Sequence, residues 1–161
     1  MKADLFGDKV KYEQFAPPFV LVALLNRFDN RYQSAADAFF KELSWKQMFF
    51  LNGITLHSEP PTIKDMADFM GCSHQNVNKL YAKLLREGYI ISVQDEKDKR
   101  KQRLFLTDKA RAFLAENKIE AGKNVNNIFS VVSADELETT IEVMAKLTER
   151  LSELYEQGDK K

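Results

Sequence analysis

The stretch that decides the fold is residues 62–87, TIKDMADFMGCSHQNVNKLYAKLLRE. A helix-turn-helix needs a small residue where its two helices cross, a glycine or similar residue at the sharp turn, and apolar residues on the inner face of the second helix. Ala67 can be the small residue, Gly71 the turn, and Val77 and Leu80 the inner face. Because all of these residues fall at compatible spacings, the stretch predicts a helix-turn-helix. The residues expected to complete its core are Ile63, Met66, Leu84 and Leu85.

The outward face of the second helix carries hydrogen-bonding side chains, and residues 73–86 include no acidic residue. Glutamine and asparagine can bond an adenine edge through two hydrogen bonds, and lysine can reach guanine or a phosphate. The N-terminal residues of such a recognition helix are the ones that meet base edges. Ser73 is the expected N-cap, and its hydroxyl could serve the helix alone. A solvated polar face is the alternative. The candidate DNA-contacting residues are Ser73, His74, Gln75, Asn76, Asn78, Lys79 and Lys83.

A β-hairpin, here called the wing, is predicted directly after the helix-turn-helix. Residues 89–93 are expected to form one strand, residues 103–106 the returning strand, and residues 94–101 a charged tip. A basic hairpin in this place can lie along the DNA backbone or reach into a minor groove, where arginine is favoured; a solvated turn is the alternative. Asp98 is expected to orient Arg100 through an ion pair. The candidate wing contacts are Lys97, Asp98, Lys99, Arg100, Lys101 and Arg103.

Helices are predicted on both sides of this region. Pro17 and Pro18 can open a helix that continues to about residue 39. A helix opening at residues 107–108 should continue toward residue 129, although a glycine at 122 weakens the prediction that it is continuous. The helix starts at residues 44, 62 and 133 carry capping-box patterns, which pair Ser44 with Gln47, Thr62 with Asp65 and Ser133 with Glu136.

The last helix, expected to end near residue 157, has an apolar seam suited to a partner helix. Its leucines and methionine recur at heptad spacing, which is typical of helices that pair. Together with the apolar first helix, this seam could form a dimer, or it could pack within one chain. The candidate dimerisation residues are Phe19, Val22, Leu137, Met144, Leu147, Leu151 and Leu154. The expected fold is therefore mainly α, a winged helix-turn-helix at residues 44–112 between dimerisation helices at residues 1–43 and 113–161.

The charge is balanced overall but segregated along the chain. The 24 basic and 24 acidic residues give no net charge, which argues against binding polyanions by bulk charge. Residues 73–111 hold ten basic and five acidic side chains, which gives a local net charge of +5. Residues 133–161 hold four basic and eight acidic side chains, which gives a local net charge of −4. The middle of the chain is therefore the candidate anion-binding surface.

Other classes of protein find little support in the sequence. A single cysteine permits no disulfide within the chain, and no N-terminal signal peptide or membrane-length apolar run is present, so a cytoplasmic protein without membrane attachment is expected. No catalytic motif, phosphate-binding loop or clustered metal ligands are present, so neither an enzyme nor a cofactor is expected. Cys72 lies at the turn before the recognition helix, where its oxidation could lower DNA affinity, but no basic residue lies near it in sequence to activate it.

Two segments resemble the MarR family of bacterial winged helix regulators: PTIKDMADFMGCSHQNVNKLYAKLLREGYI and the wing DEKDKRKQRLFLT. The Asp98-x-Arg100 pair, followed by Leu106 and Thr107, is similar to the family's wing signature. The resemblance is close over about residues 43–112 and extends to the flanking helices in their order. It implies a homodimer formed by the first and last two helices, and a minor-groove contact for Arg100. It also implies that a small, often aromatic ligand can lower DNA affinity.

The leading hypothesis is a homodimeric, sequence-specific repressor that binds a pseudo-palindromic operator in double-stranded DNA and is released by a small ligand. A dimer would read half-sites about 10 base pairs apart, or a multiple of that. Winged helices also serve as protein-interaction modules, which is one alternative. A redox-sensing regulator that acts through Cys72 is the other.

Overall fold

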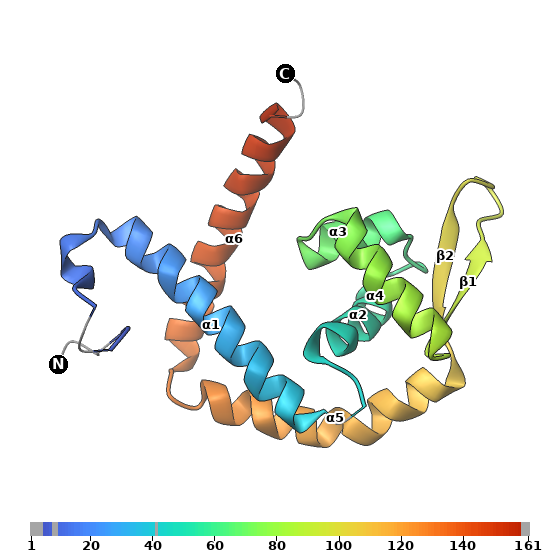
Figure 1. Ribbon diagram of the computed structural model, residues 1–161, viewed down its shortest axis with the longest axis horizontal. Coiled ribbons are helices and arrows are strands. Elements are labelled where there is room, and N and C mark those ends of the chain that lie inside the picture. The colour runs from blue at the N-terminus through green and yellow to red at the C-terminus, as the bar shows by residue number, and fades with distance from the viewer. Residues whose placement is uncertain (1–4, 8–9, 41, 159–161) are drawn as a thin grey trace. The chain divides into compact units, whose positions relative to one another are not determined.

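The computed structural model describes residues 5–7, 10–40 and 42–158. It forms two compact units, Met1–Glu116 and Asn117–Lys161. The elements follow in the order η1 (Tyr12–Gln14), α1 (Pro17–Phe39), α2 (Trp45–Leu56), α3 (Ile63–Met70), α4 (His74–Arg86), β1 (Ile90–Gln94), β2 (Gln102–Leu106), α5 (Asp108–Phe129) and α6 (Ala134–Gly158) (Figure 1). This order confirms the predicted mainly helical fold with a two-stranded wing.

The capping boxes predicted from the sequence form at the starts of α2, α3 and α6. At α3, the backbone N–H of Thr62 donates to Asp65 Oδ2 at 2.7 Å, and Thr62 Oγ1 accepts from the N–H of Asp65 at 3.2 Å. The hydrogen bond from the Thr62 backbone is the main cause of a lowered pKa at Asp65. Such reciprocal bonds satisfy N–H groups that have no partner inside the helix. Because the bonded residues are only three positions apart, the sequence pattern predicted these helix starts correctly.

The turn between α3 and α4 is built around Gly71. Its φ of 61° lies in the left-handed region that glycine adopts without strain, and the next N–H, that of Cys72, donates to Ala67 O at 3.2 Å. Ala67 and Val77 are buried, as predicted. Leu85 was wrongly assigned to the core, because its side chain is 40% exposed. The buried face of α4 is centred on Val77 and Leu84, two turns apart, and Leu85 lies about 100° further round the helix.

Helices α2 and α3 approach each other closely at Gly53. A Cβ atom at this position would lie 2.7 Å from Phe69 Cε1 and 2.8 Å from Met66 Cε. Only glycine fits at that distance without displacing α3 side chains. Because Met66 is fully buried beneath the helix-turn-helix, this contact helps to set where α3 lies.

The wing is an antiparallel pair in which Ile90 faces Leu106 and Gln94 faces Gln102. Ile90, Leu104 and Leu106 are buried on its inner face. Both strands include one polar residue more toward the tip than predicted, because Gln94 and Gln102 complete the ladder. Tyr89 lies before β1 instead of within it, since its N–H donates to Leu84 O at 2.9 Å and closes the end of α4.

Five of the seven apolar side chains that were predicted to dimerise are exposed in the single chain, and the other two, Leu137 and Met144, are half-buried. In the first unit, Phe19 is 70% exposed, and Val22 is also exposed. In the second unit, α6 exposes Leu147, Leu151 and Leu154. Helix α5 continues through Gly122 without interruption. Of the helices that the structure describes, none has the length and apolar character needed to cross a bilayer.

Candidate nucleic-acid interface

The N-terminal turn of α4 presents the predicted base-contacting side chains to solvent. Ser73 Oγ accepts from the N–H of Asn76 at 3.4 Å, so Ser73 is the N-cap. The residues after it lie on a helix fixed from beneath by fully buried Val77. The exposed polar residues of this face are His74, Gln75, Asn76, Asn78 and Lys79.

Lys83 lies near the other end of α4 and faces α2. Its Nζ donates to Gln47 Oε1 at 3.2 Å, and Gln47 Nε2 donates to Glu87 Oε2 at 3.4 Å. Gln47 is almost fully buried. Its role in the capping box was predicted, but its bonds to α4 were not, because 36 residues separate it from Lys83. These contacts fix the C-terminal end of α4 against the start of α2.

The wing tip is shaped by aspartate–backbone hydrogen bonds. Asp95 Oδ1 accepts from the N–H groups of Lys97 at 2.9 Å and Asp98 at 2.8 Å. Asp98 Oδ1 accepts from the N–H of Arg100 at 3.1 Å, and its ion pair, at 3.6 Å, is with Lys101. The predicted ion pair between Asp98 and Arg100 is therefore wrong, since Asp98 orients Arg100 through the backbone instead.

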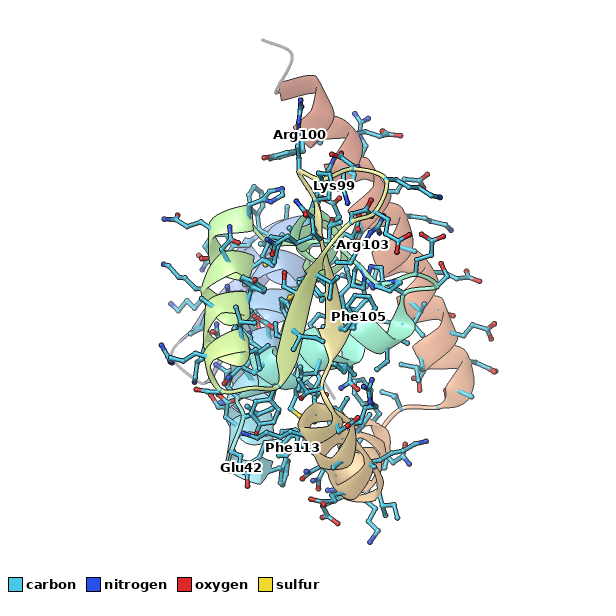
Figure 2. The ribbon with its side chains drawn as sticks, turned by 90° about the vertical axis from the view of Figure 1, so that its right-hand side faces the viewer. Glu42, Lys99, Arg100, Arg103, Phe105 and Phe113 are labelled. Carbon is cyan, nitrogen blue, oxygen red and sulfur yellow. The ribbon has the colours of Figure 1, made fainter. Side chains whose placement is uncertain are left out.

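Two cationic side chains extend from this tip. Figure 2 shows Lys99 and Arg100 at the far end of the wing, away from the body of the helix-turn-helix. Both are exposed, as are Lys97 and Lys101. A loop that presents several cations to solvent can neutralise phosphates, and an arginine at its end can enter a narrow minor groove.

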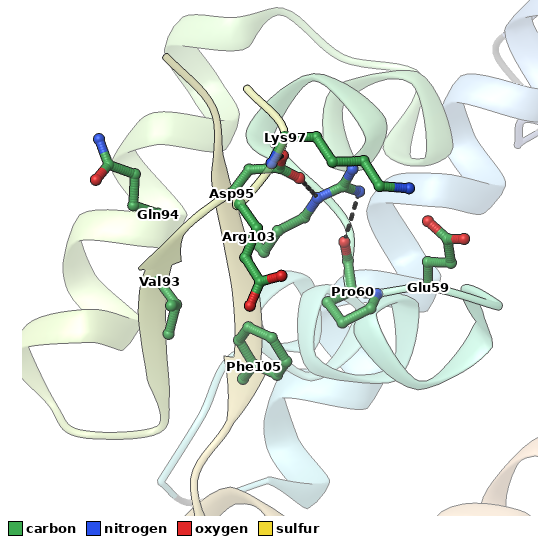
Figure 3. Close-up of a pocket in the computed structure, with 9 residues that line it drawn as sticks. Glu59, Pro60, Val93, Gln94, Asp95, Lys97, Arg103 and Phe105 are labelled. Carbon is green, nitrogen blue, oxygen red and sulfur yellow. Dashed lines mark hydrogen bonds and ion pairs between the residues drawn. The ribbon is translucent and has the colours of Figure 1, made fainter. Parts of the chain in front are cut away.

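Near the tip end of the strand pair, Arg103 contacts Asp95 and the loop in front of α3. Its Nε donates to Asp95 Oδ2 at 2.5 Å, and its Nη1 donates to the carbonyl oxygen of Pro60 at 3.0 Å (Figure 3). The hydrogen bond from Arg103, with those from the Asp98 and Lys97 backbones, lowers the pKa of Asp95 to about 2. The sequence interpretation missed this role of Asp95. The available signal was an aspartate at the start of a turn, where its side chain commonly bonds the backbone two residues on.

An aromatic series joins α1, α2 and α3. The rings of Tyr32 and Trp45 are 4.8 Å apart, those of Trp45 and Phe49 5.8 Å, and those of Phe49 and Phe69 5.0 Å. His57 meets the edge of Phe69 at 5.6 Å. Within the described residues, no group of histidine, cysteine and acidic side chains is arranged to hold a metal ion.

Residues 43–101, which contain the helix-turn-helix and most of the wing, match the model of the MarR family. Over these residues the chain is a MarR-family winged helix-turn-helix. Solved members of the family are described as transcriptional regulators, and one is a complex with DNA. The family model covers the helix-turn-helix, β1 and the wing tip, and it ends before β2.

Solved MarR-type structures share the fold over most of the chain. A MarR/EmrR family regulator from Acinetobacter sp. ADP1 matches with a TM-score of 0.76 and 15% identity, covering 86% of this chain and 99% of that one. A complex of S. aureus MepR with DNA matches with a TM-score of 0.70 and 21% identity, covering 83% of this chain and 97% of that one. PcaV from Streptomyces coelicolor, bound to its natural ligand, matches with a TM-score of 0.70 and 16% identity, covering 87% of this chain and 96% of that one. At these identities the likeness shows the fold, including the flanking helices.

Proposed function

We propose that this MarR-family regulator is a homodimeric repressor that places α4 of each protomer in the major groove of one operator half-site and its wing tip on the flanking DNA. The observation that carries the proposal is the pairing of two exposed surfaces. One is the polar N-terminal turn of α4, free of acidic residues, and the other is the cationic wing tip at Lys99 and Arg100. The first is suited to base edges and the second to phosphates or a minor groove.

The homodimer is supported by apolar side chains that a single chain leaves exposed. Leu151 is 66% exposed, and it lies one heptad after Met144 on α6. Exposed heptad leucines are stabilised by burial against a partner helix. Two copies related by a twofold axis would read inverted half-sites whose centres are about 10 base pairs apart or a multiple of that.

Release by a small aromatic ligand is supported by the aromatic series from Tyr32 to Phe69. It connects α1, proposed as a dimerisation helix, with α3 of the helix-turn-helix. A planar ligand that inserts among these rings would change the position of α3 relative to α1. The PcaV structure contains a natural ligand, which is a property of that protein.

A gel shift with the full chain tests the proposal. The probes are the DNA upstream of the chain's own gene and a scrambled duplex of equal length and composition. We expect preferential binding of the upstream DNA by a species whose mass corresponds to two protomers. Equal affinity for both duplexes, or binding by a single protomer, would contradict the proposal.

A further inference from the structure

We infer that Asp95 and Arg103 are positioning residues that fix the wing against the loop in front of α3, and that Arg103 supports DNA binding through the wing instead of touching DNA. The two side chains and the carbonyl group of Pro60 are called the wing brace. The inference rests on the wing contact proposed above.

Arg103 is held by two partners at once. Its guanidinium group donates from Nε to Asp95 Oδ2 and from Nη1 to the Pro60 carbonyl oxygen, and these two bonds hold it against the loop in front of α3 (Figure 3). Its side chain is 29% exposed, whereas Arg100 extends from the wing tip into solvent (Figure 2). Arg103 would have to break both bonds to extend into solvent as Arg100 does.

The brace acts on a stiff segment that leads into the helix-turn-helix. Pro60 and Pro61 have fixed φ angles, and α3 begins two residues later, at Ile63. The next residue of β2, Leu104, donates its N–H to the Pro61 carbonyl oxygen at 2.9 Å. Adjacent residues of β2 therefore bond adjacent prolines, and this couples the orientation of the wing to that of α3.

Asp95 joins this contact with the Pro60 loop to the wing tip. One of its oxygens accepts from Arg103, and the other accepts from the N–H groups of Lys97 and Asp98. Its side chain is only 10% exposed. The same carboxylate thus holds both Arg103 and the turn that presents Lys99 and Arg100.

Charge and position predict opposite effects when Asp95 is changed. Removing a negative charge close to DNA strengthens binding if charge alone matters, because the phosphates repel it. Removing a positioning contact weakens binding. Asp95→Asn keeps an oxygen for the backbone N–H groups but turns an amide toward Arg103. Glu96→Gln is the matched control, since it removes an equal charge from the exposed neighbour.

The test measures DNA affinity across several salt concentrations for Asp95→Asn, Arg103→Ala and Glu96→Gln, with a duplex selected by the wild-type protein from a random pool. We expect Asp95→Asn and Arg103→Ala each to weaken binding by about fivefold with an unchanged salt slope, and Glu96→Gln to bind as tightly as wild type or more tightly. In a Lys99→Ala/Arg100→Ala background, Arg103→Ala should have little further effect, because its action passes through the tip. Tighter binding by Asp95→Asn, or a salt slope reduced by about one in Arg103→Ala, would overturn the inference.

Hydrogen exchange in the free protein separates failure of the brace from failure of the proposed wing contact. Asp95 accepts hydrogen bonds from the N–H groups of Lys97 and Asp98, and Arg103→Ala should speed exchange at these two groups. Unchanged exchange there would refute the brace and leave the wing contact standing. Wild-type DNA affinity in Lys99→Ala/Arg100→Ala would refute the wing contact, and with it the part that the brace plays in DNA binding.

Discussion

Replacing Gly53 with alanine should destabilise the protein by closing the space between α2 and α3. The new Cβ atom would lie 2.7 Å from Phe69 Cε1, where carbon atoms in contact are normally about 3.5–4.0 Å apart. Phe69 cannot easily retreat, since its ring stacks on Phe49 at 5.0 Å and meets His57 at 5.6 Å. Overpacking of this kind costs about 1–3 kcal/mol, and the better helix propensity of alanine offsets about 0.5–1 kcal/mol of it. The expected net loss is about 0.5–2 kcal/mol in the free energy of unfolding.

Gly122→Ala is the matched control, because Gly122 also lies inside a helix but nothing lies within 4 Å of its added Cβ. This variant should gain about 0.5–1 kcal/mol from helix propensity alone. Urea unfolding at one fixed protomer concentration measures both changes, since the stability of a dimer depends on concentration. If Gly53→Ala were as stable as wild type, or if both variants shifted in the same direction, the reasoning from the α2–α3 contact would be refuted.

Further predictions concern the interface, the wing and the dimer. Arg100→Ala should weaken binding to all duplexes and reduce the salt slope by about one, as measured by fluorescence anisotropy; wild-type slope and affinity would exclude the wing contact. Asn76→Ala should relax sequence preference at one base pair and cost about 1–3 kcal/mol of binding free energy. Competition with single-base variants of the operator measures this preference, and an unaltered preference would show that Asn76 reads no base. Because the folded pKa of Asp95 is lowered to about 2, its ionised form stabilises the native state above the unfolded value of about 4. The stability difference between wild type and Asp95→Asn should therefore hold from pH 7 to about 4 and shrink as the pH falls toward 2, and thermal melts that show no such narrowing would count against the wing brace. Leu151→Glu should convert the dimer to monomer in sedimentation equilibrium, and a stable dimer would show that the α6 seam lies elsewhere.

The sequence predicted those features that depend on residues close together in the chain. The capping boxes at Ser44, Thr62 and Ser133 and the left-handed turn at Gly71 involve residues no more than a few positions apart, so the pattern alone placed the helix ends. The recognition helix and the exposed wing tip were predicted for the same reason.

The contacts that orient these parts could not be predicted, because they join residues far apart in sequence. The bond from Arg103 to Pro60 spans 43 residues, and that from Lys83 to Gln47 spans 36. Charge alone placed Arg103 among the wing cations with Arg100, although one is enclosed by partners and the other is exposed. The burial of Leu85 was also predicted wrongly, because neighbouring residues of a helix face different directions and Leu85 is next to the buried Leu84.

Selection of bound sequences from a random pool of double-stranded DNA, with the full chain at two salt concentrations, tests the central claim most directly. A homodimer that reads bases through α4 should enrich an inverted repeat whose half-site centres are about 10 base pairs apart or a multiple of that, and the repeat should persist at the higher salt as non-specific binding falls. A pool that stays random, or that converges on a single unrepeated half-site, would contradict it.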